Sequence, residues 1–149
     1  MTKHTGTELQ GLPDLAILGA FDKALAMQFE SVGPDKVVAW MDLGPDQHTP
    51  WGVVHGGVYT AAVETAASLG ASAAVLERGQ FAVGVNNNTD FLRPFVSGRV
   101  RVAAEPIQQG ATQQLWQVDI TREDNGKLVA RGHLRLQNVP LPDRHPDRA

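Results

Sequence analysis

One glutamate in an uncharged stretch is the residue best placed for chemistry. Between His55 and Glu77 the chain is rich in alanine and small hydroxyl residues, and Glu64 is the only side chain that is charged at neutral pH. Alanine is the best helix former. Apolar residues surround the predicted helix on nearly all sides, which is typical of a helix enclosed by its domain. An unpaired carboxylate is costly to bury. Glu64 is therefore either neutralised by an internal partner or a catalytic base or nucleophile in an apolar setting.

Two hydroxyl groups accompany this glutamate on the predicted helix. Ser68 follows Glu64 by one turn and Thr60 precedes it by one turn, so the three side chains share a face. Either hydroxyl could orient the carboxylate or hold a water molecule beside it. Each could equally be a small residue that allows close packing.

The same helix begins at His55-Gly56-Gly57. The first N–H groups of a helix lack internal partners and carry partial positive charge, and glycines let a ligand oxygen approach them. That geometry suits a carbonyl that becomes an oxyanion, although the glycines could simply permit a tight turn. Gly56 and Glu64 are about 12 Å apart along a helix, too far to act on one carbonyl. A second copy of the chain could bring both together, which predicts a site at a dimer interface.

Alternating hydrophobic residues predict strands on both sides of this helix. Asp14 can cap a short helix from Leu15 to about Asp22, and a hairpin should follow, with Leu25 and Met27 on its first strand and residues 37–43 on its second. Arg78-Gly79 marks the end of the central helix. The inward residues of four later strands are expected to be Phe81, Val83 and Val85; Val100, Val102 and Ala104; Trp116, Val118 and Ile120; and Leu128, Ala130, Leu134 and Leu136.

These elements predict an α+β fold in which an antiparallel sheet of five or six strands wraps around one long central helix. The first of the four later strands should end at Asn86-Asn87-Asn88, and Asn125-Gly126 should join the last two. We expect a single domain over residues 12–138, with flexible termini at 1–11 and 139–149. A sheet that covers one helix leaves edges open, so self-association is a natural completion.

Composition narrows the function classes. The chain has 149 residues, a net charge of −3 and no cysteine, which argues against a nucleic-acid partner and excludes disulfides and thiolate chemistry. His48 and His55 lack partners at metal spacing, so no metal or cofactor is expected. The polar N-terminus is unlike a signal peptide, and no run has the roughly 18 strongly apolar residues of a membrane span. We expect a cytoplasmic protein without a membrane partner.

Trp51-Gly52-Val53-Val54-His55-Gly56-Gly57, followed by Glu64 and Ser68, resembles the hotdog-fold acyl-CoA thioesterases. The most similar branch is that of the Arthrobacter-type 4-hydroxybenzoyl-CoA thioesterase, with relatives in phenylacetate degradation and menaquinone synthesis. The resemblance spans residues from about Leu12 to Leu136 and includes Asn88-Thr89-Asp90-Phe91-Leu92-Arg93-Pro94. It implies an acyl-CoA substrate and a dimer, or a dimer of dimers, with active sites between subunits.

The resemblance also implies roles for individual residues. The Gly56 N–H would polarise the thioester carbonyl, with His55 supporting the loop and Gly57 beside it, while Glu64 of the neighbouring subunit acts as nucleophile or general base. Ser68 matches a residue that places water. Residues expected to contact the substrate or its CoA portion are Gly57, Asn88, Arg93, Ala111 and Thr112.

One position departs from the family pattern. Six residues before the HGG histidine the family commonly has Gln or Asn, and here that position is Thr49, which cannot supply an amide donor. Thr49 could act through water, His48 could substitute, or activity could be reduced. We therefore expect an acyl-CoA thioesterase for small or medium acyl groups, aromatic ones included. The alternatives are a non-catalytic acyl-CoA-binding protein, which the change at Thr49 favours, and a hydroxyacyl thioester dehydratase.

Overall fold

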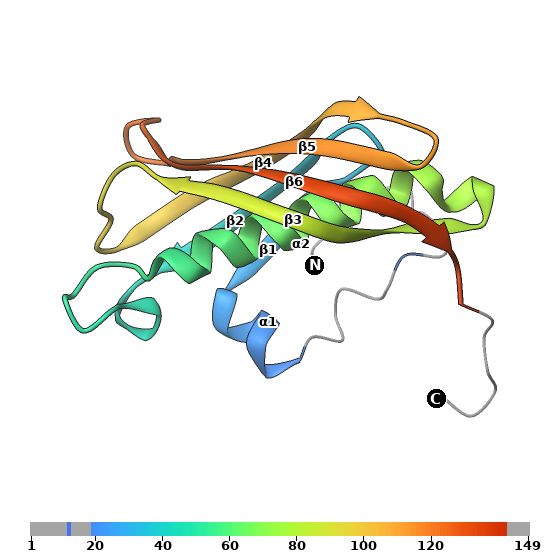
Figure 1. The fold of residues 1–149 in the computed structure, drawn as a ribbon. Coiled ribbons are helices and arrows are strands. Elements are labelled where there is room, and N and C mark those ends of the chain that lie inside the picture. The colour runs from blue at the N-terminus through green and yellow to red at the C-terminus, as the bar shows by residue number, and fades with distance from the viewer. Residues whose placement is uncertain (1–11, 13–18, 143–149) are drawn as a thin grey trace.

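The computed structural model describes residue 12 and residues 19–142, which form one antiparallel sheet packed on one long helix. The elements are α1 (Ala20–Leu25), β1 (Met27–Val32), β2 (Val37–Leu43), the 3-10 helix η1 (Pro45–Gln47), α2 (Gly56–Val75), the 3-10 helix η2 (Leu76–Arg78), β3 (Gln80–Phe91), β4 (Gly98–Gln109), β5 (Gln113–Arg122) and β6 (Leu128–Pro140). Neighbouring strands follow the order β1-β2-β4-β5-β6-β3. Figure 1 shows the curved sheet arching over α2, which confirms the predicted α+β hotdog fold.

Small residues let α2 lie close beneath the sheet. Ala62, Ala66 and Ala67 are fully buried on the helix, where they join the same hydrophobic core as Trp116 of β5. At Gly70 the helix comes so close that an added methyl group would lie 2.5 Å from the Trp116 ring. Although α2 is rich in apolar residues, no helix in the described part of the chain is long and apolar enough to cross a membrane.

The N-terminal helix differs from the prediction. The structure shows α1 at Ala20–Leu25, so Leu25 belongs to the helix and the strand starts only at Met27. Ala26 ends α1 in the left-handed conformation, with φ of 56°, and turns the chain into β1. Residues 13–18, including the expected cap Asp14, lie outside the described residues. The predicted hairpin is confirmed, because β1 pairs with β2.

Strand β3 was predicted with the wrong face inward and too short. Ala82 and Gly84 face α2, whereas Val85 is exposed. The strand does not end at the asparagines but continues to Phe91, with a bulge between Gly84 and Asn86. A bulge adds one residue and resets which side chains face inward. After it, Asn87 and Thr89 face the helix side, and their neighbours point away.

The C-terminal strand is longer than predicted. Val139 and Pro140 were expected in a flexible tail, yet they pair with Phe81 and Gln80 of β3. The backbone N–H of Leu141 then donates to the Gly79 carbonyl at 3.0 Å, which ties the strand end to the turn after η2. Hydrogen bonds to β3 thus extend β6 past the expected boundary. Residues 143–149 lie outside the described residues.

A buried polar network fixes the turn between β4 and β5. Gln114 donates to the Ala71 carbonyl and to Asn138 Oδ1, both at 2.9 Å, and accepts from Trp116 Nε1 at 2.9 Å. Asn138 Nδ2 in turn donates to the carbonyls of Gly110 and Ala111 at 3.2 Å. Because buried polar groups are costly unless paired, this network holds the turn and the C-terminal half of α2 in one arrangement.

Candidate active site

Glu64 lies where α2 runs beside β3, at the edge of the sheet. Its carboxylate packs against the backbone of Gly84, so closely that a methyl group at that position would overlap Glu64 Oε1. The side chain is half-buried rather than enclosed, because β3 is an edge strand and nothing in the described chain covers the far side of this helix face. The pattern that predicted a helix enclosed on nearly all sides therefore does not hold at Glu64 in the single chain.

Asn87 is the side chain that contacts this carboxylate. Its Nδ2 donates to Glu64 Oε2 at 3.1 Å and to the Thr60 carbonyl at 3.0 Å. Asn88, one of the residues expected to contact the substrate or its CoA portion, is exposed and lies on the other side of β3. The sequence carries three successive asparagines, and only the bulge decides which of them turns toward α2. Sequence alternation alone could not have found Asn87.

The start of α2 has the geometry expected for holding a carbonyl oxygen. His55 is the N-cap, and its Nδ1 accepts from the Gly57 N–H at 2.8 Å. The Val58 N–H donates to the His55 carbonyl at 3.0 Å. Within the described part of the chain this leaves the Gly56 N–H without a partner, while the Gly57 N–H is occupied. The geometry supports His55 as the residue that orders this loop.

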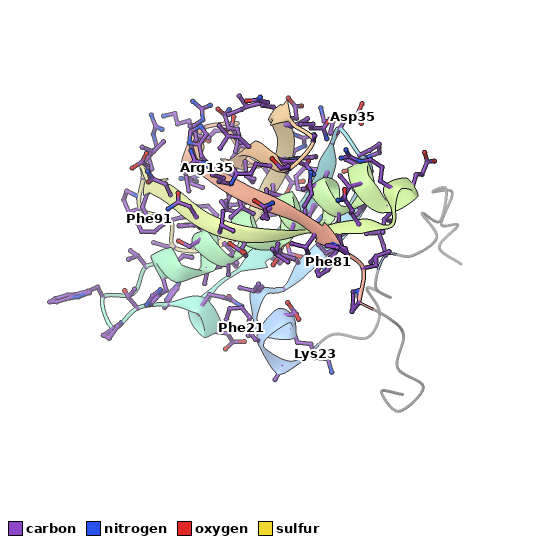
Figure 2. The ribbon with its side chains drawn as sticks, turned by 45° about the vertical axis from the view of Figure 1, so that its right-hand side comes forward. Phe21, Lys23, Asp35, Phe81, Phe91 and Arg135 are labelled. Atoms are coloured by element: carbon purple, nitrogen blue, oxygen red, sulfur yellow. The ribbon has the colours of Figure 1, made fainter. Side chains whose placement is uncertain are left out.

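Gly56 lies directly under an aromatic ring. A methyl group at Gly56 would be 2.6 Å from Phe91 Cε2, and the Phe91 and Tyr59 rings lie 6.1 Å apart. Figure 2 shows Phe91 at the far end of β3 from Phe81. Phe91 is 56% exposed and Trp51, in the loop before α2, is 90% exposed. Large exposed apolar residues often mark a binding or subunit surface.

The hydroxyl groups predicted beside Glu64 do not bond to it. Thr60 Oγ1 donates to the Gly56 carbonyl at 3.3 Å, and Ser68 is half-buried with no hydrogen bond found for its side chain in the described part of the chain. Thr49 Oγ1 accepts from the Trp51 N–H at 3.2 Å, so its hydroxyl stabilises a local turn. His48 Nε2 lies 2.6 Å from the Val96 carbonyl oxygen, which ties that ring to the loop before β4.

The residues expected to contact CoA lie elsewhere. Ala111 and Thr112 are exposed in the β4–β5 turn held by the buried polar network. Arg93 is exposed and donates through Nη1 to the Leu128 carbonyl at 2.6 Å. Two other arginines are neutralised: Arg131 pairs with Asp119, and Arg99 pairs with Asp42 and holds the pKa of Asp42 below its usual range. Arg93 keeps further donors for a phosphate, since a guanidinium has five.

Tyr59, next to the candidate site, carries an unusual hydroxyl. The side chain is 3% exposed, and its hydroxyl has no hydrogen-bond partner in the described part of the chain. Burial raises the pKa of Tyr59 to about 12, against about 10 for an ordinary tyrosine. The folded state therefore keeps the phenol proton more tightly than the unfolded state. This difference in proton binding stabilises the folded state fully below about pH 10, and the stabilisation is lost as pH rises toward 12.

Replacing Tyr59 by phenylalanine is expected to raise the free energy of unfolding by about 1 kcal/mol at pH 8, because an unpaired buried hydroxyl costs about that much or more. Urea denaturation checks this value. Tyr59 is the only tyrosine in the chain, so the ultraviolet absorbance of phenolate titrates it directly, with an expected midpoint near pH 12 in the folded protein. A midpoint near 10 in folded protein, or a less stable variant, would contradict the burial of this hydroxyl.

Comparisons with known proteins show the family to which the chain belongs. Residues 52–129, more than half of the chain, match the profile of the thioesterase superfamily. A proposed esterase of Mycobacterium tuberculosis, Rv1847, is 46% identical over 137 residues, covering 88% of this chain and 97% of that protein. Its structure has a TM-score of 0.79, with 48% identity over 83% of this chain and 99% of that one.

Two further relatives carry more specific names. The thioesterase HI1161 of Haemophilus influenzae has a structure with a TM-score of 0.76 and 36% identity, over 85% of this chain and 88% of that one. The 1,4-dihydroxy-2-naphthoyl-CoA hydrolase of Escherichia coli is 34% identical over 112 residues, covering 74% of this chain and 79% of that protein. The fold and these similarities together identify the chain as a thioesterase-superfamily hydrolase.

Proposed function

We propose that the protein hydrolyses the thioester of a small or medium acyl-CoA, aromatic acyl groups included, to the free acid and CoA. One observation carries the proposal: α2 presents at its start a Gly56 N–H that has no partner among the described residues, and further along a Glu64 carboxylate oriented by Asn87. Thioester hydrolysis needs an N–H that donates to the carbonyl oxygen and a carboxylate that acts as a general base or a nucleophile. The E. coli relative is named for a substrate with an aromatic acyl group. This name favours an aromatic substrate and membership of the branch of the 4-hydroxybenzoyl-CoA thioesterases.

The proposed site requires two subunits. Gly56 and Glu64 are eight positions apart on α2, about 12 Å along the helix, so the two groups of one helix cannot act on the same carbonyl. A second copy packed against the open face of α2 would bring its Gly56 opposite Glu64. Strand β3 is an edge strand with exposed Val85, Phe91 and Leu92, and such an edge is suited to pairing. We propose a dimer, or a dimer of dimers, on this basis.

Bond making and breaking follow from these positions. The Gly56 N–H would donate to the thioester oxygen as negative charge develops there. Glu64 would then either attack the carbonyl carbon, expelling the CoA thiolate and forming an anhydride that water cleaves, or remove a proton from the water that attacks. Either route releases one carboxylate and one thiol. Arg93, Ala111 and Thr112 are proposed to contact the CoA portion, and Ser68 to hold the water.

A second candidate function is acyl-CoA binding without hydrolysis. It is favoured by Thr49, whose hydroxyl is engaged in a turn and which offers no amide at the position where the family commonly has one. A dehydratase fits less well, because such sites usually pair a catalytic histidine with an acid, and the His55 ring is occupied as the helix cap.

A thioester panel separates these functions. The purified protein is incubated with benzoyl-, phenylacetyl- and hexanoyl-CoA, and free thiol is followed, while binding of each thioester is measured by calorimetry. We expect thiol release from at least one substrate, with the aromatic substrates preferred. Tight binding without thiol release on the whole panel would favour the binding protein. A hydroxyacyl-CoA is incubated in parallel, and its conversion to an enoyl-CoA would favour the dehydratase.

A further inference from the structure

We infer that Asn87 is a positioning residue that sets the orientation of the Glu64 carboxylate, and that Thr89 in turn fixes the Asn87 amide. The inference rests on the proposed function, since it concerns how the acid is held for hydrolysis. It concerns residues of a single chain, all of them on α2 and β3.

Every polar atom of the Asn87 side chain is engaged. Nδ2 donates to the Thr60 carbonyl at 3.0 Å and to Glu64 Oε2 at 3.1 Å, while Oδ1 accepts from Thr89 Oγ1 at 2.7 Å. The orientation of an amide is assigned from its partners. A backbone carbonyl can only accept, so Nδ2 must face Thr60, and this places its second hydrogen on Glu64.

Two glycines make room for this arrangement. Gly84 allows the Glu64 carboxylate to lie against the β3 backbone. Gly132 is the cross-strand partner of Thr89 on β6. A methyl group added at Gly132 would lie 2.7 Å from Thr89 Oγ1 and 2.6 Å from Val63 Cγ2. Thr89 thus occupies a space that a side chain on β6 would fill. The bulge before Asn86 then aims Asn87 and Thr89 at the helix instead of their neighbours.

The consequence is a carboxylate held through one oxygen. Asn87 binds Oε2, and Oε1 has no hydrogen-bond partner in the described part of the chain. A free glutamate side chain samples several rotamers, whereas this one is fixed through Oε2, and its Oε1 accepts no hydrogen bond from the described residues. Displacing a reacting group by about 1 Å can cost about 10²-fold in rate, so loss of the Asn87 contact should lower kcat and leave KM nearly unchanged.

Steady-state kinetics of variants on the most active thioester test this inference. Asn87→Asp keeps the shape but removes the donor and adds a like charge beside Glu64, and it should lower kcat about 10²-fold. Thr89→Val removes only the hydroxyl and should lower kcat about tenfold, the value of one lost hydrogen bond. Thr89→Ser keeps the hydroxyl and should retain most of the wild-type kcat. KM should stay within about threefold throughout.

Asn86→Asp is the matched control. It makes the same change on the same strand, at an exposed residue opposite Arg135, where an acid is tolerated. It should retain activity within about twofold. Wild-type kcat in Asn87→Asp and Thr89→Val, or equal losses in Thr89→Val and Thr89→Ser, would overturn the inference and leave the proposed function standing. If Asn87→Asp fails to fold, the Thr89 pair still decides. A wild-type protein that cleaves no thioester would instead overturn the proposed function.

Discussion

The Glu64→Gln variant is expected to lose activity on every thioester that the wild-type protein cleaves, with kcat lowered by about 10²–10⁴-fold. Glutamine keeps the size of the side chain and can still accept a hydrogen bond from Asn87, so the packing against Gly84 should survive. It can neither remove a proton from water nor attack a carbonyl. Glu64→Ala should be at least as impaired. Free thiol release under saturating substrate measures the effect, and KM should change little.

Glu77→Gln provides the control for this substitution. Glu77 is an exposed acid in η2, directly after the same helix, and its replacement removes one negative charge without touching the candidate site. It should keep activity within about twofold, because surface substitutions of this kind rarely disturb a fold. Equal rates for wild type, Glu64→Gln and Glu64→Ala on all substrates would contradict the catalytic role of Glu64.

Isotope labelling distinguishes the two roles left open for Glu64. In single turnovers with ¹⁸O-labelled water, a general base directs all of the label into the released acid. A nucleophile forms an anhydride, and water that attacks the Glu64 carbonyl of this anhydride leaves label in the protein. Mass spectrometry of the peptide containing Glu64 therefore detects the nucleophilic route.

The fold could be predicted because its main signals are local. The alanine-rich helix, the break at Gly79 and the alternation in the last three strands follow from propensity and spacing, and the structure confirms them. Strand β3 is the exception. Its larger apolar residues, such as Val85, face outward because the helix lies so close that Ala82 and Gly84 must face inward. Close approach is a tertiary property that alternation does not report.

The candidate site was only partly predictable for the same reason. Gly56 and Glu64 could be selected because a helix start and a lone acid have physical meaning in sequence. Asn87 could not be selected, because the bulge between Gly84 and Asn86 decides which of three identical residues faces α2. Thr49 Oγ1 and the Gly57 N–H each take part in a local hydrogen bond that depends on the loop conformation, which the sequence does not reveal.

The Gly56→Ala variant is expected to lower kcat by about 10²–10³-fold, the usual effect of losing one oxyanion donor. The added methyl group would stand beside the N–H where the thioester oxygen must approach, and it would also press on the Phe91 ring at 2.6 Å. Phe91 is 56% exposed and can move aside, so the fold should survive. Thermal unfolding checks this, and thiol release measures the loss.

The contact with Phe91 has to be separated from the loss of the donor. Phe91→Ala alone should reduce activity only a few-fold, because the ring supplies neither the N–H donor nor the carboxylate. The double variant Gly56→Ala/Phe91→Ala relieves the steric contact but keeps the methyl group, so it should remain as impaired as Gly56→Ala. Recovery of activity in the double variant would mean that displacement of the ring, and not a blocked N–H, explains the loss.

Mixing the two impaired chains tests whether Gly56 and Glu64 of one site come from different subunits. Consider a dimer of one Gly56→Ala chain and one Glu64→Gln chain in which each site takes Gly56 from one subunit and Glu64 from the other. One site then carries both substitutions, and the other site carries neither. Half of the dimers in a statistical mixture are of this kind, so about a quarter of the wild-type activity should return. If each site used Gly56 and Glu64 of the same chain, every site would carry one lesion and mixing would restore nothing.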